Sequence, residues 1–348
     1  MLDVVRRAYL GADVLRRLQG NAAAAIGFGP TECPYQITAS GPYWRLRDYG
    51  GRNALASLLI VAAPIKPPYI WDLTPSTSAI AYCLQQHLHA YLLEWMPATR
   101  ITSNNGFDES TLAISNCIAK ILAKSNDAKP FLMGHSLGGT LATIYGASAS
   151  ETVRGLVLLG APLCFQPGEN DFRDALVSLV MPSELPEAEP FPGSLLSLMS
   201  MLASPSTFIW SRLIDAAFSF DDPYAMDIHA RIERWALDEV PLPGKLVRQI
   251  IEWLYRENRL CRGALEVGGR ILGPSDLSIP TLAVVNVTDQ IAPLASVKPF
   301  IEAIPTGLAR LIEYRGELGV CLQHLGILVG RQAYANVWPQ IVAWLSSI

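Results

Sequence analysis

Residues 130–147 read PFLMGHSLGGTLATIYGA, and this order of residue types suits few folds. An apolar run leads into a glycine-rich turn with Ser136 at its centre, and small and apolar residues follow directly. The turn fits the pattern Gly-x-Ser-x-Gly, in which the serine sits in a strained turn between a strand and a helix. Gly134 and Gly138 suit that turn because larger side chains would clash there. The segment predicts a strand, a turn with an exposed serine, and a helix.

The rest of the chain alternates strand-like and helix-like segments. Near-continuous apolar runs of strand length suit parallel strands that are buried on both faces. Strands alternating with helices predict an α/β fold with a doubly wound, mostly parallel sheet. The expected strands are 57–65, 89–95, 130–134, 155–160 and 281–287, and the expected helices are 76–88, 108–125 and 137–149.

This alternation stops between about Cys164 and Ser275. The segment is rich in proline and aromatic residues and continues into two helix-like stretches. It is too long for a loop between two core strands, so it predicts a mostly helical cap inserted into the sheet domain. The expected organisation is an N-terminal helix with lead-in strands (1–55), a core (56–164 and 276–348) and a cap (165–275).

The N-terminal segment predicts an amphipathic helix from Leu2 to about Leu18. Packing on its own domain is favoured over a lipid or polymer surface. Arginines interrupt its apolar runs, which argues against a signal peptide. No run in the chain reaches the ~18 apolar residues of a membrane span. The apolar side chains expected near one face of the helix are Val5, Leu10, Val14 and Leu18.

Charge and cysteine content exclude several classes of function. The chain of 348 residues has a formal net charge of −4, so no basic surface for nucleic acid is expected. Its six cysteines form no CxxC pair, and the spacing of Cys321 and His324 has no partner pair for a metal site. Reduced thiols in a cytoplasmic protein are expected.

A serine nucleophile needs a base, and only two histidines follow Ser136. In α/β-hydrolases the order along the chain is serine, acid, histidine. His229 falls in a helix of the predicted cap, whereas His324 falls in a loop-like segment before the last helix. His324 is therefore the preferred base, and His229 is the alternative.

The acid of such a site follows a late core strand and precedes the histidine. Asp289 stands directly after the predicted strand 281–287. It would orient the imidazole and stabilise the imidazolium form. Asp276 lies before that strand, and Glu313 and Glu317 follow a further strand, so these three are less favoured.

Two backbone N–H groups are expected to form the oxyanion hole. The first is that of Leu137, which starts the helix after the serine. The second belongs to the loop after strand 57–65, where Pro64, Pro67 and Pro68 have no N–H to give. Ile65 and Lys66 are the candidates that remain.

Several segments together resemble the polyhydroxyalkanoate synthases, especially the catalytic subunit of the two-component class III enzymes. The similarity covers roughly residues 30 to 346, in order. It implies an α/β-hydrolase fold with a cap, the catalytic residues Ser136, Asp289 and His324, and hydroxyacyl-CoA or hydroxyalkanoate chains as substrates. The segments are LLIVAAPIKPPYIWDLTPSTS, FLMGHSLGGTLA, IERWALDEVPLPG, WLYRENRLCRGALEVGGR, LSIPTLAVVNVTDQIAP, LQHLGILVG and NVWPQIVAWL.

The chain departs from that family at the nucleophile, because the synthases resemble Gly-x-Cys-x-Gly and this chain has Ser136. Gln323 also stands where the family usually has glycine. An acyl-cysteine is an energetic donor to an alcohol, whereas an acyl-serine is an ordinary ester that water attacks more easily unless it is excluded.

The sequence therefore predicts a serine hydrolase acting on hydroxyacyl esters, polyesters or acyl-CoA thioesters. The alternative is an acyltransferase or polyhydroxyalkanoate synthase that uses serine, and a water-sealed pocket would favour it. A non-catalytic polymerase partner or granule protein is a third hypothesis. No cofactor is expected. A homodimer, a partner subunit and a position at a polymer granule stay open.

Overall fold

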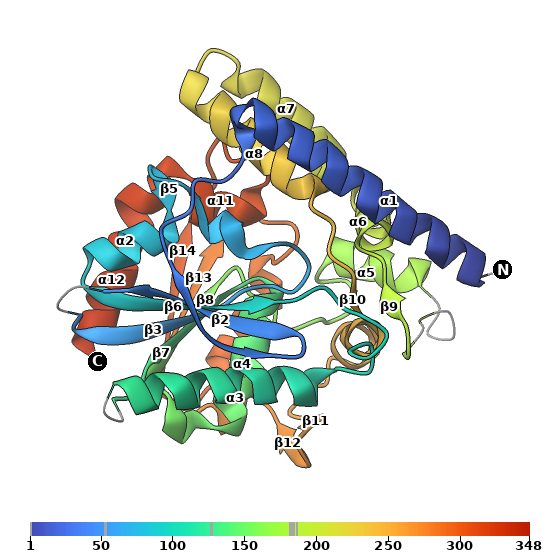
Figure 1. Cartoon of the computed structure of the whole chain (residues 1–348). Helices are drawn as coiled ribbons and strands as arrows, with labels where there is room; N and C mark the ends of the chain where they lie inside the picture. The colour runs from blue at the N-terminus through green and yellow to red at the C-terminus, as the bar shows by residue number, and fades with distance from the viewer. Residues whose placement is uncertain (1, 52–53, 126–127, 181–184, 186) are drawn as a thin grey trace.

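The computed structural model describes residues 2–51, 54–125, 128–180, 185 and 187–348. Its centre is an eight-stranded sheet in the order β1-β2-β6-β3-β7-β8-β13-β14 (Figure 1). Pairing is parallel from β6 to β14 and antiparallel at β1–β2 and β2–β6. The expected doubly wound, mostly parallel sheet is confirmed. The strands are β1 Gln36–Gly41, β2 Trp44–Gly50, β3 Ala56–Val61, β6 Leu88–Trp95, β7 Phe131–His135, β8 Gly155–Leu159, β13 Thr281–Asn286 and β14 Ala309–Tyr314.

Apolar side chains leave both faces of this sheet, because neighbouring residues of a strand point to opposite sides. In β3, Leu59 and Val61 pack into one buried cluster, whereas Leu58 and Ile60 pack into the other. The first cluster includes side chains of α3, α4 and α10, and the second includes those of α2, α11 and α12. These helices are α2 Ala79–Gln85, α3 Phe107–Lys124, α4 Leu137–Ser148, α10 Lys298–Glu302, α11 Gly326–Val329 and α12 Trp338–Ser347.

The expected elements are all present, with shifted ends. The strand expected at 57–65 stops at Val61, because the segment that follows turns into a proline-containing loop. The helix expected at 76–88 begins only at Ala79, after a small hairpin of β4 (Asp72–Thr74) and β5 (Thr77–Ser78). Short helical turns complete the core: η2 Pro68–Trp71, η3 Ser150–Thr152, η7 Pro274–Asp276, η8 Leu294–Ser296, η9 Gln323–Leu325 and η10 Ala333–Val337.

The segment 165–275, here called the cap segment, is largely helical where it is described. Its apolar side chains form a buried cluster of their own, which includes Phe172, Leu176 and Ile251. Its domain boundaries stay a prediction. The elements are α5 Asp171–Leu179, β9 Pro190–Phe191, α6 Gly193–Ala203, η5 Ser206–Trp210, α7 Ser211–Ser219, α8 Pro223–Leu237, β10 Leu242–Pro243, α9 Gly244–Gln249, η6 Ile250–Arg256, β11 Leu265–Val267 and β12 Arg270–Leu272.

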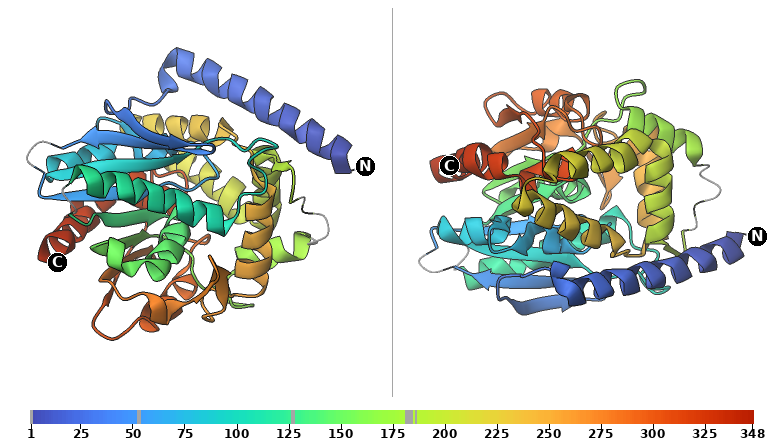
Figure 2. Two further views of the ribbon diagram at one scale, coloured as in Figure 1. Left: turned by 60° about the horizontal axis from the view of Figure 1, so that its bottom comes forward. Right: turned by 90° about the horizontal axis from the view of Figure 1, so that it is seen from above.

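The N-terminal helix α1 (Leu2–Ala23) lies across the cap segment, against α6 and α8 (Figure 2). It continues into η1 (Ala24–Phe28). The expectation that it packs by an apolar face is wrong for Val14 and Leu18, which are 50% and 58% exposed. Polar contacts hold it instead: the buried Asp13 carboxylate accepts the N–H groups of Gly193 and Ser194 at the start of α6. The side chain of Val5 lies outside the described part of the chain.

No helix in the described ranges is both long and apolar enough to span a bilayer.

The expectation that all cysteines are reduced is wrong for one pair. Cys164 and Cys261 form a disulfide, with their Cα atoms 5.0 Å apart and 97 positions apart in sequence. They meet because the chain leaves the core after β8 and returns near the same place after η6. Cysteine spacing cannot reveal a pair that only the tertiary fold brings together. The free cysteines are Cys33, Cys83, Cys117 and Cys321.

Candidate active site

Ser136 occupies the sharp turn that the sequence predicts between β7 and α4. Its φ of 55° and ψ of −135° are unusual for a residue with a side chain, and such strain persists only where the surroundings hold it. The close packing also explains Gly138, where an added Cβ would lie 2.2 Å from the carbonyl oxygen of Val61. The turn therefore presents the hydroxyl at the carboxyl edge of the parallel strands.

His324 and Asp289 are joined by a buried hydrogen bond. Nδ1 of His324 lies 2.6 Å from Oδ2 of Asp289, which follows β13 as expected. The other oxygen, Oδ1, accepts the backbone N–H groups of Ile291 at 2.8 Å and Ala292 at 3.1 Å. Because the carboxylate accepts, Nδ1 carries the hydrogen and Nε2 presents a lone pair.

The electrostatic surroundings keep Asp289 charged. Burial by itself raises the pKa of the carboxyl group, but the His324 ring and the N–H groups of Ala292 and Ile291 lower it more. The net result is a pKa below the ordinary value. A carboxylate in this state can stabilise an imidazolium ion at its partner histidine.

Ser136 and His324 line the same cavity. The two residues are only 8% and 9% exposed, and Asp289 behind them is 3% exposed. Nε2 of His324 is buried, and none of the described residues gives it a hydrogen-bond partner. A histidine whose second nitrogen has no partner, in a cavity that a serine also lines, can accept the serine proton once a bound substrate brings the two groups together.

The alternative residues lie elsewhere. His229 contacts Asp215 in the cap segment. Asp276 caps the turn at Gly273, and the Glu317 carboxylate accepts the N–H of Gln332. Glu313 is exposed on β14. Of the weighed histidines and acids, the structure brings together only His324 and Asp289 with Ser136.

The expected oxyanion donors surround the same cavity. Leu137 is the first residue of α4, where backbone N–H groups have no partner within the helix. Ile65 and Lys66 line the cavity beside Ser136. Nζ of Lys66 donates to the carbonyl oxygen of Ala236 at 2.6 Å and lies 2.8 Å from Glu239, so this loop is tied to the cap segment. Which of Ile65 and Lys66 gives the second N–H stays a prediction.

His135, directly before Ser136, is a residue of the candidate site that the sequence analysis missed. Its Nε2–H donates to the carbonyl oxygen of His324 at 2.8 Å, and the two rings are 4.6 Å apart. Burial, assisted by the neighbouring His324 ring, lowers the pKa of His135 to about 3. His135 is therefore neutral and fixes the backbone of His324. Its place beside Ser136 was the available signal, but only the fold shows what it contacts.

One cluster outside this site has metal-ligand chemistry. His229, Glu233 and Cys321 each offer a ligand atom within 4.8 Å of the others. However, Nε of Arg212 donates to one Glu233 oxygen at 2.8 Å, and its terminal nitrogen pairs with the other oxygen. The guanidinium thus neutralises the carboxylate that a metal would need. Cys321 lies with Glu233 rather than with His324, its neighbour in sequence.

A family model described as alpha/beta hydrolase fold matches residues 77–316. The chain belongs to this family.

Curated relatives extend the similarity over nearly the whole chain. The poly(3-hydroxyalkanoate) polymerase subunit PhaC of Haloferax mediterranei is 27% identical over 350 residues, covering 99% of this chain and 68% of its own length. The proteins of the same name from Synechocystis and Allochromatium vinosum are each 25% identical, over 99% of this chain and 91% and 96% of their own lengths. The resemblance to polyhydroxyalkanoate synthases is confirmed.

Solved structures of low identity share the fold. A monoglyceride lipase variant from Saccharomyces cerevisiae aligns with a TM-score of 0.57 at 13% identity, over 91% of this chain and 96% of its own. A putative lipase from Sulfolobus solfataricus aligns with a TM-score of 0.55 at 16% identity, over 90% and 93%. These likenesses bear on architecture alone.

Proposed function

We propose that this protein is an acyltransferase that extends a polyester, taking hydroxyacyl groups from a thioester through an acyl-Ser136 intermediate. Two things support this choice over the hydrolase that the serine alone predicts. The relatives over nearly the full chain are named polymerase subunits. The proposed nucleophile, Ser136, is also only 8% exposed, in a cavity lined by side chains of the cap segment.

The observation that carries the proposal is the burial of the site. An acyl-serine passes to water unless water is kept away, since the ester has no energetic preference for an alcohol. Here Ser136 and His324 line a cavity of about 220 Å³. Most of its lining is apolar, so bulk water is a poor competitor for a bound hydroxyl group.

The proposed reaction has two halves. In the first, Nε2 of His324 takes the Ser136 proton while the oxygen attacks the thioester carbonyl, and the thiol leaves with that proton. The N–H of Leu137 and one N–H of the 65–66 loop stabilise the oxyanion. In the second, a chain-end hydroxyl gives its proton to His324 and attacks the acyl-serine. The Ser136 oxygen then takes that proton back, and the chain is one unit longer.

Side chains of the cap segment shape the acyl site. The cavity is lined by Phe172 and Leu176 of α5, Leu196 of α6 and Ile251 of η6, which contribute only apolar surface. Such a wall suits the hydrocarbon part of a hydroxyacyl group. Charged side chains line other parts of the cavity, at Arg16, Lys66, Arg212 and Glu239. The cap segment is thus proposed as the part that sets acyl specificity.

Hydrolysis is a second candidate function because the proposed nucleophile is a serine, whose acyl ester passes to water more easily than to an alcohol unless water is excluded. The same residues would cleave an ester or thioester if water, rather than a hydroxyl-bearing chain, met the acyl-serine. The two candidates share the first half-reaction and differ only in the acceptor.

The test is an incubation of the purified protein with 3-hydroxybutyryl-CoA and 3-hydroxyoctanoyl-CoA. Free thiol is followed with a thiol reagent, and acyl products are followed by mass spectrometry. Oligomers that lengthen with time are expected. If free hydroxy acid is the sole product, the protein is a hydrolase and the proposed transferase activity is wrong.

The matched control is Ser136→Ala, in which thiol release and acyl products should both disappear while the melting temperature is retained. Turnover in this variant above trace level would show that Ser136 is not the nucleophile, whichever product is formed.

A further inference from the structure

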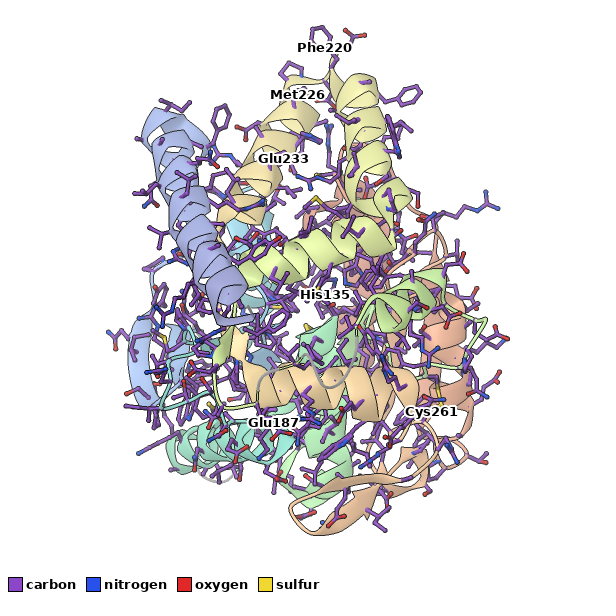
Figure 3. The ribbon with its side chains drawn as sticks, turned by 90° about the vertical axis from the view of Figure 1, so that its right-hand side faces the viewer. His135, Glu187, Phe220, Met226, Glu233 and Cys261 are labelled. Carbon is purple, nitrogen blue, oxygen red and sulfur yellow. A yellow bond between two sulfur atoms is a disulfide. The ribbon has the colours of Figure 1, made fainter. Side chains whose placement is uncertain are left out.

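The loop that carries His324 is held from two sides. On the sheet side, Nδ2 of Asn286 donates to the carbonyl oxygen of Gln323 at 2.9 Å, and His135 donates to the carbonyl oxygen of His324. On the other side lie the cap helices α7 and α8. Figure 3 shows Phe220 and Met226 at the far tip of these helices, with Glu233 below them and His135 near the centre of the molecule.

The contact from the cap side is a carboxylate. Asp215 of α7 is 4% exposed, and each of its oxygens accepts a backbone N–H of the histidine loop. Oδ1 accepts from Gly319 at 2.8 Å, and Oδ2 accepts from Cys321 at 2.8 Å. Nδ1 of His229 on α8 lies 3.3 Å from Oδ2 and completes the environment of the carboxylate.

The loop has an unusual backbone where Asp215 binds it. Gly319 has a φ of +83° and Cys321 a φ of +61°, the second being uncommon for a residue with a side chain. Gly319 also packs closely on α8, where an added Cβ would lie 2.9 Å from the Cβ of Ala225. A conformation of this kind persists only when its surroundings determine it, and both N–H bonds to Asp215 fall on these two residues.

Asp215 is suited to this task because it is ionised. Burial raises the pKa of its carboxyl group, but His229 and the N–H groups of Cys321 and Gly319 lower it more. A charged acceptor forms stronger hydrogen bonds to N–H groups than a neutral one does.

From these contacts we infer that Asp215 is a positioning residue, which fixes the loop bearing His324 against cap helix α7. Cys321 is three residues from His324, so a shift of the loop moves the imidazole relative to Ser136. Docking of the cap segment on the core therefore also places His324 correctly relative to Ser136 and Asp289. This inference rests on the proposed function in one respect, that His324 is the base for Ser136.

The test compares Asp215→Ala with Asp222→Ala. Asp222 is a matched control because it is also a cap carboxylate that accepts two backbone N–H groups, those of Tyr224 and Ala225, and it pairs with Arg331 of the core. Within the described part of the chain, its side chain forms no hydrogen bond or ion pair with residues 319–324. The first readout is the rate at which a fluorophosphonate labels Ser136. The second is hydrogen exchange of the backbone amides of residues 319–323.

Asp215→Ala should slow labelling by about ten- to a hundredfold, as misplacing a catalytic group by an ångström does. It should lower kcat with little change in KM, and the loop amides should exchange faster. Asp215→Asn keeps one acceptor oxygen and should fall between Asp215→Ala and the wild type. Asp222→Ala should match the wild type in labelling rate and loop exchange.

Wild-type labelling in Asp215→Ala would overturn the inference. So would equal slowing in both alanine variants, since that would indicate a general loss of cap stability. If Asp215→Ala does not fold, Asp215→Asn decides by the same comparison. If the wild type itself is not labelled at Ser136, the proposed nucleophile fails, and the exchange data alone still decide whether Asp215 anchors the loop.

Discussion

His135 makes the stability of this site sensitive to acid. In the unfolded chain a histidine takes up a proton at about pH 6.5. In the fold, burial lowers the pKa of His135 to about 3. Between these two values the unfolded state binds more protons than the folded state, so the free energy of unfolding must decrease as the pH falls.

The residue can therefore be tested by substitution. Between pH 6 and pH 4.5, His135 should contribute a slope of up to about 1.4 kcal/mol per pH unit to the free energy of unfolding. His135→Gln, which keeps a donor for the His324 carbonyl oxygen but does not titrate, should lose this part of the slope in urea denaturation. The exposed His87→Gln is the control. An unchanged slope in His135→Gln would mean that His135 is charged in the fold.

In the proposed reaction, the oxygen of Ser136 determines how readily the acyl group passes to an alcohol. A thioester at this position would be a stronger acyl donor than the oxoester that serine forms. Ser136→Cys should raise the ratio of ester-linked product to free acid by about tenfold, equivalent to about 1.4 kcal/mol in the relative barriers. Mass spectrometry of the products measures this ratio. Ser148→Cys, at the far end of α4, should leave it unchanged.

At the scale of elements, the strand–turn–helix around Ser136 was predictable because its sequence is local and its geometry demands glycine. Asp289 and His324 were chosen from where strands end and from their order after Ser136. The structure places Asp289 on the His324 ring, and His324 lines one cavity with Ser136. The contacts of His135 and Asp215 with the loop that carries His324 were not predictable from the sequence. That loop lies almost 190 positions after His135 and just over 100 positions after Asp215, and only the fold brings it near them. The apolar face of α1 was wrongly predicted to be the packed face. Polar contacts such as those of Asp13 hold the helix on the cap segment, and Val14 and Leu18 stay exposed.

Helix α5 provides the element-scale prediction, because Leu176 is buried and lines the cavity beside Ser136. Leu176→Trp should fill part of that space and lower kcat/KM for an eight-carbon hydroxyacyl thioester by about 10- to 200-fold, the range for steric discrimination in an apolar pocket. A four-carbon thioester should be less affected. Leu213→Trp on the exposed face of α7 should change neither value. Equal losses for both chain lengths would mean that α5 does not set specificity.

At the scale of the whole molecule, the disulfide ties the root of the cap segment to the core. A bond closing a loop of 97 residues restricts the unfolded chain strongly. Reduction, or Cys164→Ser, should lower the free energy of unfolding by about 2–5 kcal/mol. Guanidinium denaturation with and without a reductant measures this difference in free energy. The control is Cys83→Ser, which keeps the disulfide and should still be destabilised by the reductant. A wild type that does not respond would show that the bond contributes nothing.

The same bond changes the covalent topology of the chain. Between Cys164 and Cys261 the polypeptide is a closed ring that contains helices α5 to α9 and η6, with two linear arms that together form the sheet. Figure 3 labels Cys261, where the ring closes. A single proteolytic cut inside the ring opens it without separating the arms. The nicked protein would migrate as one band on a non-reducing gel and as two on a reducing gel, and its sheet would remain one covalent unit.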